Sequence, residues 1–149
     1  MGKPKILPPT YFLVAIVAMI VSGLFLPLAS IIPPFWNLVG VIPFAAGVYL
    51  SIAADGMFHK ANTTVIPGEE SSQLVTGGLY RLTRNPMYLG FVLILLGVAV
   101  LLRSLTPYLF VIAFVILIDR AFIRMEEGML ARKFGAAWNA YRRTTRRWI

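Results

Sequence analysis

The sequence has 149 residues, of which 58% are hydrophobic and only 13% are charged, about half the charged share of an average soluble domain. This composition excludes an ordinary soluble protein and favours one integral membrane domain. The formal charge of +8 comes from basic residues that flank apolar stretches, as membrane topology requires, so we reject a nucleic-acid partner.

The first third of the chain contains two predicted membrane spans. No Asp, Glu, Lys, Arg or His lies between Lys5 and Asp55, and this stretch can cross a bilayer twice at about 20 residues a span. We place the spans at residues 11–32 and 35–54, separated by a pair of prolines. Pro27 is expected to kink the first span or end it early. The first span is too long for the apolar region of a signal peptide, so we expect it to be retained.

A polar segment over residues 55–85 follows, and its Pro-Gly and Gly-Gly pairs predict a loop. Two shorter apolar stretches form the spans 87–102 and 105–118, joined by a tight turn at Arg103. Both are short for a full crossing, so a re-entrant hairpin is the alternative. Residues 119–141 keep a helical pattern but become amphipathic and basic, which predicts a helix that leaves the membrane and lies along its surface.

The predicted fold class is all-α. It is an integral membrane bundle of about four transmembrane helices, with a cytoplasmic loop and an amphipathic C-terminal helix, in one domain over residues 1–149. Of the 14 Lys and Arg residues, all but Arg103 fall in the N-terminus, the 55–86 segment or the tail from Arg120. Four spans put those three regions on one side, and the positive-inside rule makes that side cytoplasmic. Both termini are therefore predicted to be cytoplasmic.

A polar stretch over residues 78–90 leads into the third predicted span. Pro86 suits the first turn of a helix, and Asn85 can cap that helix. Arg84 can pair bidentately with a carboxylate or phosphate at the mouth of the bundle, where two tyrosines add rings and hydroxyls. The same residues fit a merely structural helix start with a positive-inside arginine and interfacial tyrosines, and physics alone leaves both interpretations open.

A second group of charges lies on the predicted surface helix. At about 100° per residue, Asp119 and Glu126 nearly coincide on a helical wheel, with Arg120, Arg124 and Glu127 on the adjoining sector. Such a face is usually solvated and tied by ion pairs within the helix. The functional alternative turns one acid toward the polar loop, where it could bind ribose hydroxyls or neighbour a cationic ligand.

The order of these motifs is specific. It runs Gly-x-Tyr, then Arg-Asn-Pro-x-Tyr-x-Gly, then two apolar helices, then Glu-Glu-x-x-Leu-x-x-x-Phe-Gly-x-x-aromatic-x-x-Tyr. This pattern resembles the isoprenylcysteine carboxyl methyltransferase and phospholipid methyltransferase superfamily. The resemblance covers residues 63–149, and Pro67 with the stretch 74–78 is similar to the family's approach to its first motif.

The resemblance implies a small methyltransferase of a bacterial or archaeal inner membrane, with S-adenosylmethionine held at the cytoplasmic ends of its last helices. The residues that match the family's cofactor-binding positions are Gly78, Tyr80, Arg84, Asn85, Pro86, Tyr88, Glu126, Glu127 and Tyr141. The catalytic residue is unknown, with Arg84 and Glu127 as candidates. Asn85 stands where the isoprenylcysteine enzymes usually have His, which argues against a prenylcysteine substrate. Trp138 stands where Tyr is common.

Methyl transfer is an in-line displacement from a sulfonium, so the protein must align the reactants and exclude water. The rings of Tyr80, Tyr88 and Tyr141 are candidates to stabilise that cation. The chain has no cysteine and one histidine, so we expect no metal. For His59 we favour an interfacial loop residue over a catalytic base.

The predicted acceptor is lipid-like or amphiphilic and is reached from within the bilayer, with membrane lipids as partners. Gly40 and Gly47 in the second span permit close helix packing or leave a groove. The basic tail would lie against anionic headgroups. The alternative function is a non-catalytic small membrane protein, such as a transporter or an assembly subunit. A proton-coupled transporter usually carries an intramembrane acid, and the predicted spans contain none.

Overall fold

The computed structural model describes residues 7–61 and 72–149, and this part of the chain is all-helical, which confirms the predicted fold class. The elements are α1 (Pro8–Phe25), the 3-10 turn η1 (Trp36–Gly40), α2 (Val41–Lys60), the 3-10 turn η2 (Gly78–Arg81), α3 (Pro86–Leu102), α4 (Thr106–Ile118), the π-turn η3 (Asp119–Ile123) and α5 (Arg124–Thr144). The lysines of the N-terminus and Pro67 lie outside the described residues.

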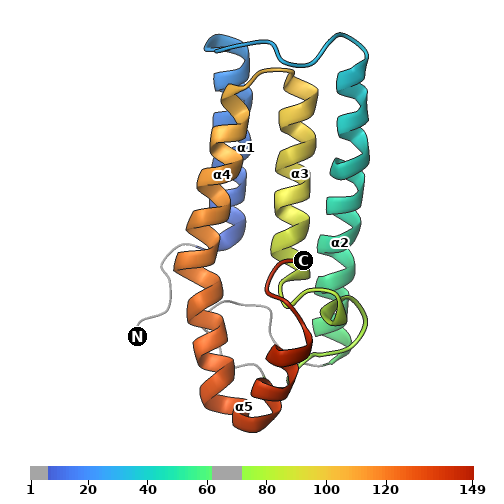
Figure 1. Cartoon of the computed structure of the whole chain (residues 1–149), viewed down its shortest axis with the longest axis vertical. Coiled ribbons are helices and arrows are strands. Elements are labelled where there is room, and N and C mark those ends of the chain that lie inside the picture. The colour runs from blue at the N-terminus through green and yellow to red at the C-terminus, as the bar shows by residue number, and fades with distance from the viewer. Residues whose placement is uncertain (1–6, 62–71) are drawn as a thin grey trace.

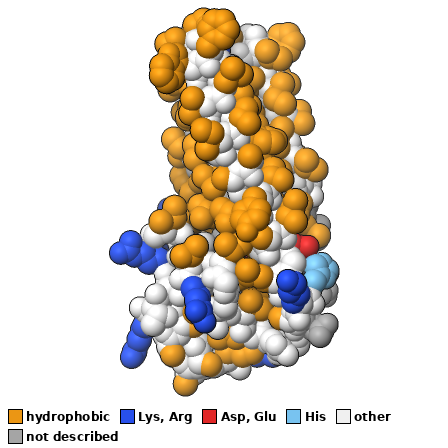
Figure 2. Space-filling model, turned by 90° about the vertical axis from the view of Figure 1, so that its right-hand side faces the viewer, with side chains coloured by type: hydrophobic (Ala, Val, Ile, Leu, Met, Phe, Trp, Pro, Cys, Tyr) orange, Lys and Arg blue, Asp and Glu red, His pale blue; other side chains and the backbone are white. Residues whose placement is uncertain are grey.

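The long helices run side by side, with α3 between α2 on one side and α1 with α4 on the other (Figure 1). Three stretches are long and apolar enough to cross a membrane: α1, the 25 residues of η1 with α2, and the 39 residues from Thr106 to Thr144. The shorter apolar helix is α3, with 17 residues. Figure 2 shows apolar side chains over the upper part of the molecule, with Lys and Arg side chains at the lower end. The chain is an integral membrane protein.

Two predicted spans have the wrong bounds. The first helix ends at Phe25 instead of residue 32, which confirms the expectation that Pro27 ends it early: Leu26 precedes Pro27, and a residue before proline avoids the helical conformation. The second runs to Lys60, six residues beyond the predicted end at 54, so the start of the predicted loop is helical. This extra turn and a half packs Met57 and Phe58 against a small buried cluster at the lower end of the molecule, and it places His59 Nε2 3.3 Å from the Asp55 carboxylate.

Up to Phe134, the predicted surface helix continues α4 along the long axis of the bundle (Figure 1). Before the kink at Gly135, Thr106 to Phe134 make 29 residues, which at 1.5 Å per residue is roughly 43 Å, about one and a half times the thickness of a hydrocarbon core. The lower part of this stretch therefore extends beyond the span. The helix reverses at Gly135, whose φ of 48° lies in the left-handed region that favours glycine, and the chain then returns toward α3.

The ends of the helices sort into two groups. The start of α1, the end of α2, η2, the start of α3 and α5 lie at the lower end (Figure 1), as four antiparallel helices require. At the upper end, Arg103 donates from Nε to the Ile32 carbonyl at 3.0 Å, and Ser30 pairs with Ser104 in an isolated antiparallel bridge. These contacts close the loop after α1 over the α3–α4 turn. The cytoplasmic location of the lower end stays a prediction.

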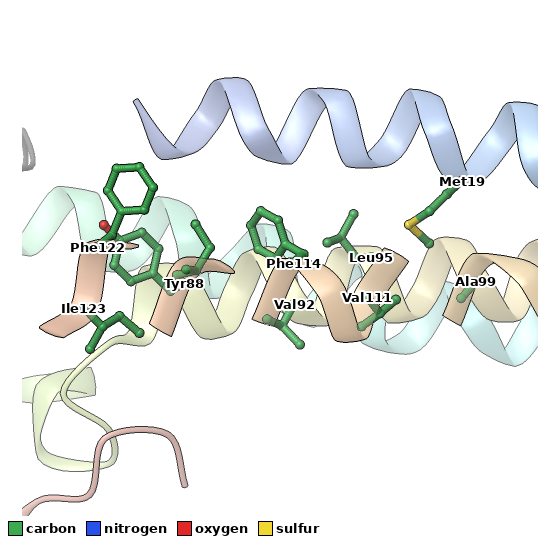
Figure 3. Close-up of a cluster of buried hydrophobic side chains, with 10 residues drawn as sticks. Met19, Tyr88, Val92, Leu95, Ala99, Val111, Phe114, Phe122 and Ile123 are labelled. Carbon is green, nitrogen blue, oxygen red and sulfur yellow. The ribbon is translucent and has the colours of Figure 1, made fainter. Parts of the chain in front are cut away.

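The main core follows α3 between α1 and α4 (Figure 3). On its other side α3 meets α2 through glycines, with Gly40 against Gly97 and Gly47 against Gly90. A Cβ added at Gly47 would lie 2.5 Å from the Gly90 carbonyl oxygen, so the two helix backbones are in direct contact. Two roles were expected for these glycines, close helix packing or a groove, and the structure shows close helix packing.

Candidate functional site

A small aromatic core forms at the lower end of the bundle, separate from the main core. Tyr141 donates its hydroxyl to the Tyr80 carbonyl at 2.6 Å, and the ring of Trp138 meets that of Tyr141 edge-on at 5.8 Å. Phe58 of α2 packs edge-on against Tyr80, with ring centroids 5.3 Å apart. Burial raises the pKa of the Tyr80 phenol above its ordinary value, the direction expected for a neutral phenol packed among apolar side chains. It ties α5 to η2 and to the end of α2.

Arg84 lies beside this core, and its side chain is only 9% exposed. Its Nε and Nη2 both donate to Glu127 Oε1, at 3.1 and 2.8 Å, so Arg84 pairs with a carboxylate of the chain itself, through one oxygen and not in the bidentate form expected. Its Nη1 donates to the carbonyls of Arg142 and Thr145 at 3.1 and 2.6 Å. The guanidinium carbon lies 5.7 Å from the ring centroid of Trp138, within the range of a cation–π contact. Arg84 therefore joins the loop before α3 to both limbs of α5.

The paired acids face different partners. Glu126 accepts a hydrogen bond from the Tyr88 hydroxyl at 2.7 Å, at the lower end of the main core. Glu127 faces Arg84 and the tail. The two side chains diverge because adjacent residues of a helix point about 100° apart. One carboxylate thus lies toward the apolar core and the other lies in a charged cluster.

The predicted coincidence of Asp119 with Glu126 on one helical face is wrong. Asp119 shares a partner with Glu127 instead, because Arg147 donates from Nη1 to Asp119 Oδ1 at 3.0 Å and from Nη2 to Glu127 Oε2 at 2.6 Å. The cause is η3, a π-turn that inserts an extra residue between the acids. With the extra residue, Asp119 shares a helical face with Glu127, eight positions on, and not with Glu126, seven positions on.

The tail after α5 supplies the groups that sequence reasoning missed. The Arg147 carbonyl accepts from Thr83 Oγ1 and from Asn85 Nδ2, each at 2.9 Å, and the Arg84 amide donates to the Arg146 carbonyl at 2.9 Å. Asn85 stands at the N-cap of α3, but its side chain makes no capping bond, so its predicted capping role is wrong. The basic composition of the tail was the only sequence signal, and it carries no information about which acids the tail meets.

The remaining predicted residues have local roles. Pro86 opens α3 in its first turn, as predicted. Gly78 has a φ of 56° and lies against Met57 of α2. His59 lies on α2, not in a loop, and its Nε2 is 3.3 Å from the Asp55 carboxylate, with the His59 side chain 75% exposed. Glycine and proline thus shape the backbone of the loop, while the arginine, tyrosines and acids form its contacts.

Comparisons with known proteins bear on the whole of this region. The family described as Phospholipid methyltransferase matches residues 35–137, more than half of the chain. An uncharacterized protein of Haemophilus influenzae is 38% identical over 63 residues, which are 42% of this chain and 100% of that relative. No solved structure gives a significant match. The family match includes the polar loop, both helices that follow it and the paired acids, whereas Tyr141 and Arg147 lie beyond it.

Proposed function

The chain belongs to the phospholipid methyltransferase family, and from that premise we propose that it transfers a methyl group from S-adenosylmethionine to a lipid-like or amphiphilic acceptor. One observation carries the proposal: the two motif regions meet. Arg84 contacts Glu127 and Tyr88 contacts Glu126, although 43 and 38 residues separate the partners along the chain. A helix start that served only to anchor α3 would not require acids from α5.

The side chains of this cluster suit the proposed cofactor. The carboxylates of Glu127 and Asp119 can accept hydrogen bonds from hydroxyl or ammonium groups, and Arg84 can pair with a carboxylate. The rings of Trp138 and Tyr80 are buried, at 2% and 5% exposed, so the site would have to open before either ring could meet an aromatic base or a cation. When bound, S-adenosylmethionine supplies an activated methyl group on a positively charged sulfur. We assign to Arg84 and Glu127 the task of holding and orienting it.

The position of Glu126 supports an amphiphilic acceptor. Its partner Tyr88 belongs to the main core, while Glu127 next to it belongs to the charged cluster. This pair therefore marks the level at which the apolar bundle ends and the polar site begins. An acceptor with an apolar tail and a polar head would bring its head to the same level. The methyl transfer would then take place at the membrane boundary, away from bulk water.

Calorimetry of S-adenosylmethionine binding to the detergent-purified protein tests the proposal. Arg84→Ala and Glu127→Gln should each weaken binding by about fivefold or more, because removing a charged partner from a largely buried site costs about 1–3 kcal/mol. Arg132→Ala, which removes an equal charge from an exposed position on α5, should leave the affinity unchanged. Unchanged affinity in both test variants, with circular dichroism showing intact helices, would refute the assigned site. Absence of binding to the unmodified protein would favour a non-catalytic membrane protein.

A further inference from the structure

The tail after α5 occupies the polar groups that the proposed function assigns to the cofactor. Arg147 contacts both oxygens of Glu127, with Nε 3.2 Å from Oε1 and Nη2 2.6 Å from Oε2. Its third nitrogen, Nη1, reaches Asp119 at 3.0 Å. The Arg147 side chain thus occupies the hydrogen-bond acceptors of both Glu127 and Asp119, the two carboxylates that could otherwise bind a hydroxyl or an ammonium group.

The backbone of the tail fills the opposite side of the same site. The Thr145 carbonyl accepts from Arg84 Nη1 at 2.6 Å, which satisfies the nitrogen that Glu127 leaves free. The Arg147 carbonyl accepts from the Asn85 amide at 2.9 Å. These are the polar groups of the loop before α3, so a ligand that used them would compete with the tail.

The tail is held mainly by polar contacts, which a polar ligand can exchange, and Trp148 adds one apolar contact with the main core. Residues 145–149 form no helix, and Arg147 keeps 31% of its side chain exposed. Its ion pairs therefore remain partly screened by water. Segments outside the packed helices, with few buried apolar contacts, open locally at a lower free-energy cost than the core does. By contrast, Arg84 and Glu127 are 9% and 13% exposed and lie between packed helices.

We propose that residues 145–149 form a strap that closes the site, and that Arg147 must leave Glu127 and Asp119 before the cofactor can use these acids. The inference rests on the proposed function, since it is the cofactor that displaces the strap. When no ligand is bound, the Arg147 cation of the closed strap neutralises the charges of Glu127 and Asp119. The affinity for the cofactor is then the intrinsic affinity reduced by the fraction of molecules with an open strap.

The first test is the affinity of Arg147→Ala for S-adenosylmethionine, measured by calorimetry. Removal of the competing cation should tighten binding by about five- to thirtyfold, the factor for loss of one modest contact. Arg146→Ala is the matched control, because it removes the same charge from the neighbouring, exposed side chain and should change nothing. Weaker or equal binding by Arg147→Ala would overturn the strap and make the tail a permanent wall of the site. Arg147→Lys, which keeps the charge but not the forked contact, should tighten binding by a smaller factor.

A second test reads the strap without any activity. The chain has no cysteine, and Thr145 is 6% exposed, so Thr145→Cys places a lone thiol at a buried position of the closed strap. Its reaction with a maleimide should be slow, and either Arg147→Ala or added S-adenosylmethionine should accelerate it. If binding is observed but neither change accelerates labelling, the strap is refuted while the proposed function stands. If no binding is observed but Arg147→Ala accelerates labelling, the proposed function fails while the movable tail is supported.

Discussion

The contact between α2 and α3 allows a quantitative test through the substitution Gly47→Ala. The added Cβ would lie 2.5 Å from the Gly90 carbonyl oxygen and 2.7 Å from the Ile94 amide nitrogen, whereas ordinary contact begins at 3.4 Å. Both obstacles are helix backbone, so α2 has to move away from α3 by roughly 0.9 Å along the shorter contact. We expect the free energy of unfolding to fall by about 1–3 kcal/mol, the usual cost of overpacking.

Gly56→Ala on the same helix is the control, because an added Cβ there has no atom within 4 Å. It should raise the free energy of unfolding by up to about 1 kcal/mol, since alanine favours a helix over glycine. Both variants can be compared by denaturant unfolding in detergent micelles, with tryptophan fluorescence as the signal that monitors unfolding. The same chemical change should thus have opposite signs nine positions apart. Equal stabilisation by both substitutions would refute direct backbone contact between the helices.

In sealed cells, a cysteine at Ser72 should be labelled only from the cytoplasm, and a cysteine at Phe35 only from the opposite face. The reason is that η1 starts at the upper end of the bundle, whereas Ser72 lies between α2 and η2. Labelling of both cysteines from one face would contradict the topology. Tyr88→Phe should lower the free energy of unfolding by about 1–3 kcal/mol, because Glu126 loses its hydrogen-bond donor in the core, and an unchanged denaturation midpoint would argue against that contact. Arg124→Ala should cost less than about 1 kcal/mol, since its side chain is 61% exposed, and a larger loss would mean that its ion pair is not screened.

Hydropathy predicted the apolar helices better than it predicted their ends. The third span was predicted at 87–102 and the helix is Pro86–Leu102, because a proline opens it and Arg103 leaves the helical conformation at once. The end of α1 depends instead on one local conflict at Pro27, which hydropathy does not register. The end of α2 depends on the contact of Phe58 with Tyr80, 22 residues further along the chain, so composition alone placed it too early.

The site shows the same division between local and long-range information. The motifs indicated which acids and which arginine belong together, and Arg84 does contact Glu127. The place of Asp119 could not be predicted, because a helical wheel assumes a constant turn and η3 breaks it. Arg147 could not be predicted either, since its contacts require the reversal at Gly135 and the return of the chain to the start of α3.

Methyl transfer by the purified protein tests the central claim most directly. The protein would be incubated with S-adenosylmethionine labelled in its methyl group, together with a total membrane lipid extract and, separately, a set of water-soluble amines, thiols and carboxylates. We predict that label enters the lipid fraction and that Arg84→Ala, shown to be folded, abolishes most of this transfer. Transfer confined to the water-soluble acceptors would contradict an amphiphilic acceptor, and absence of label in every acceptor, with cofactor binding demonstrated, would contradict a lipid methyltransferase.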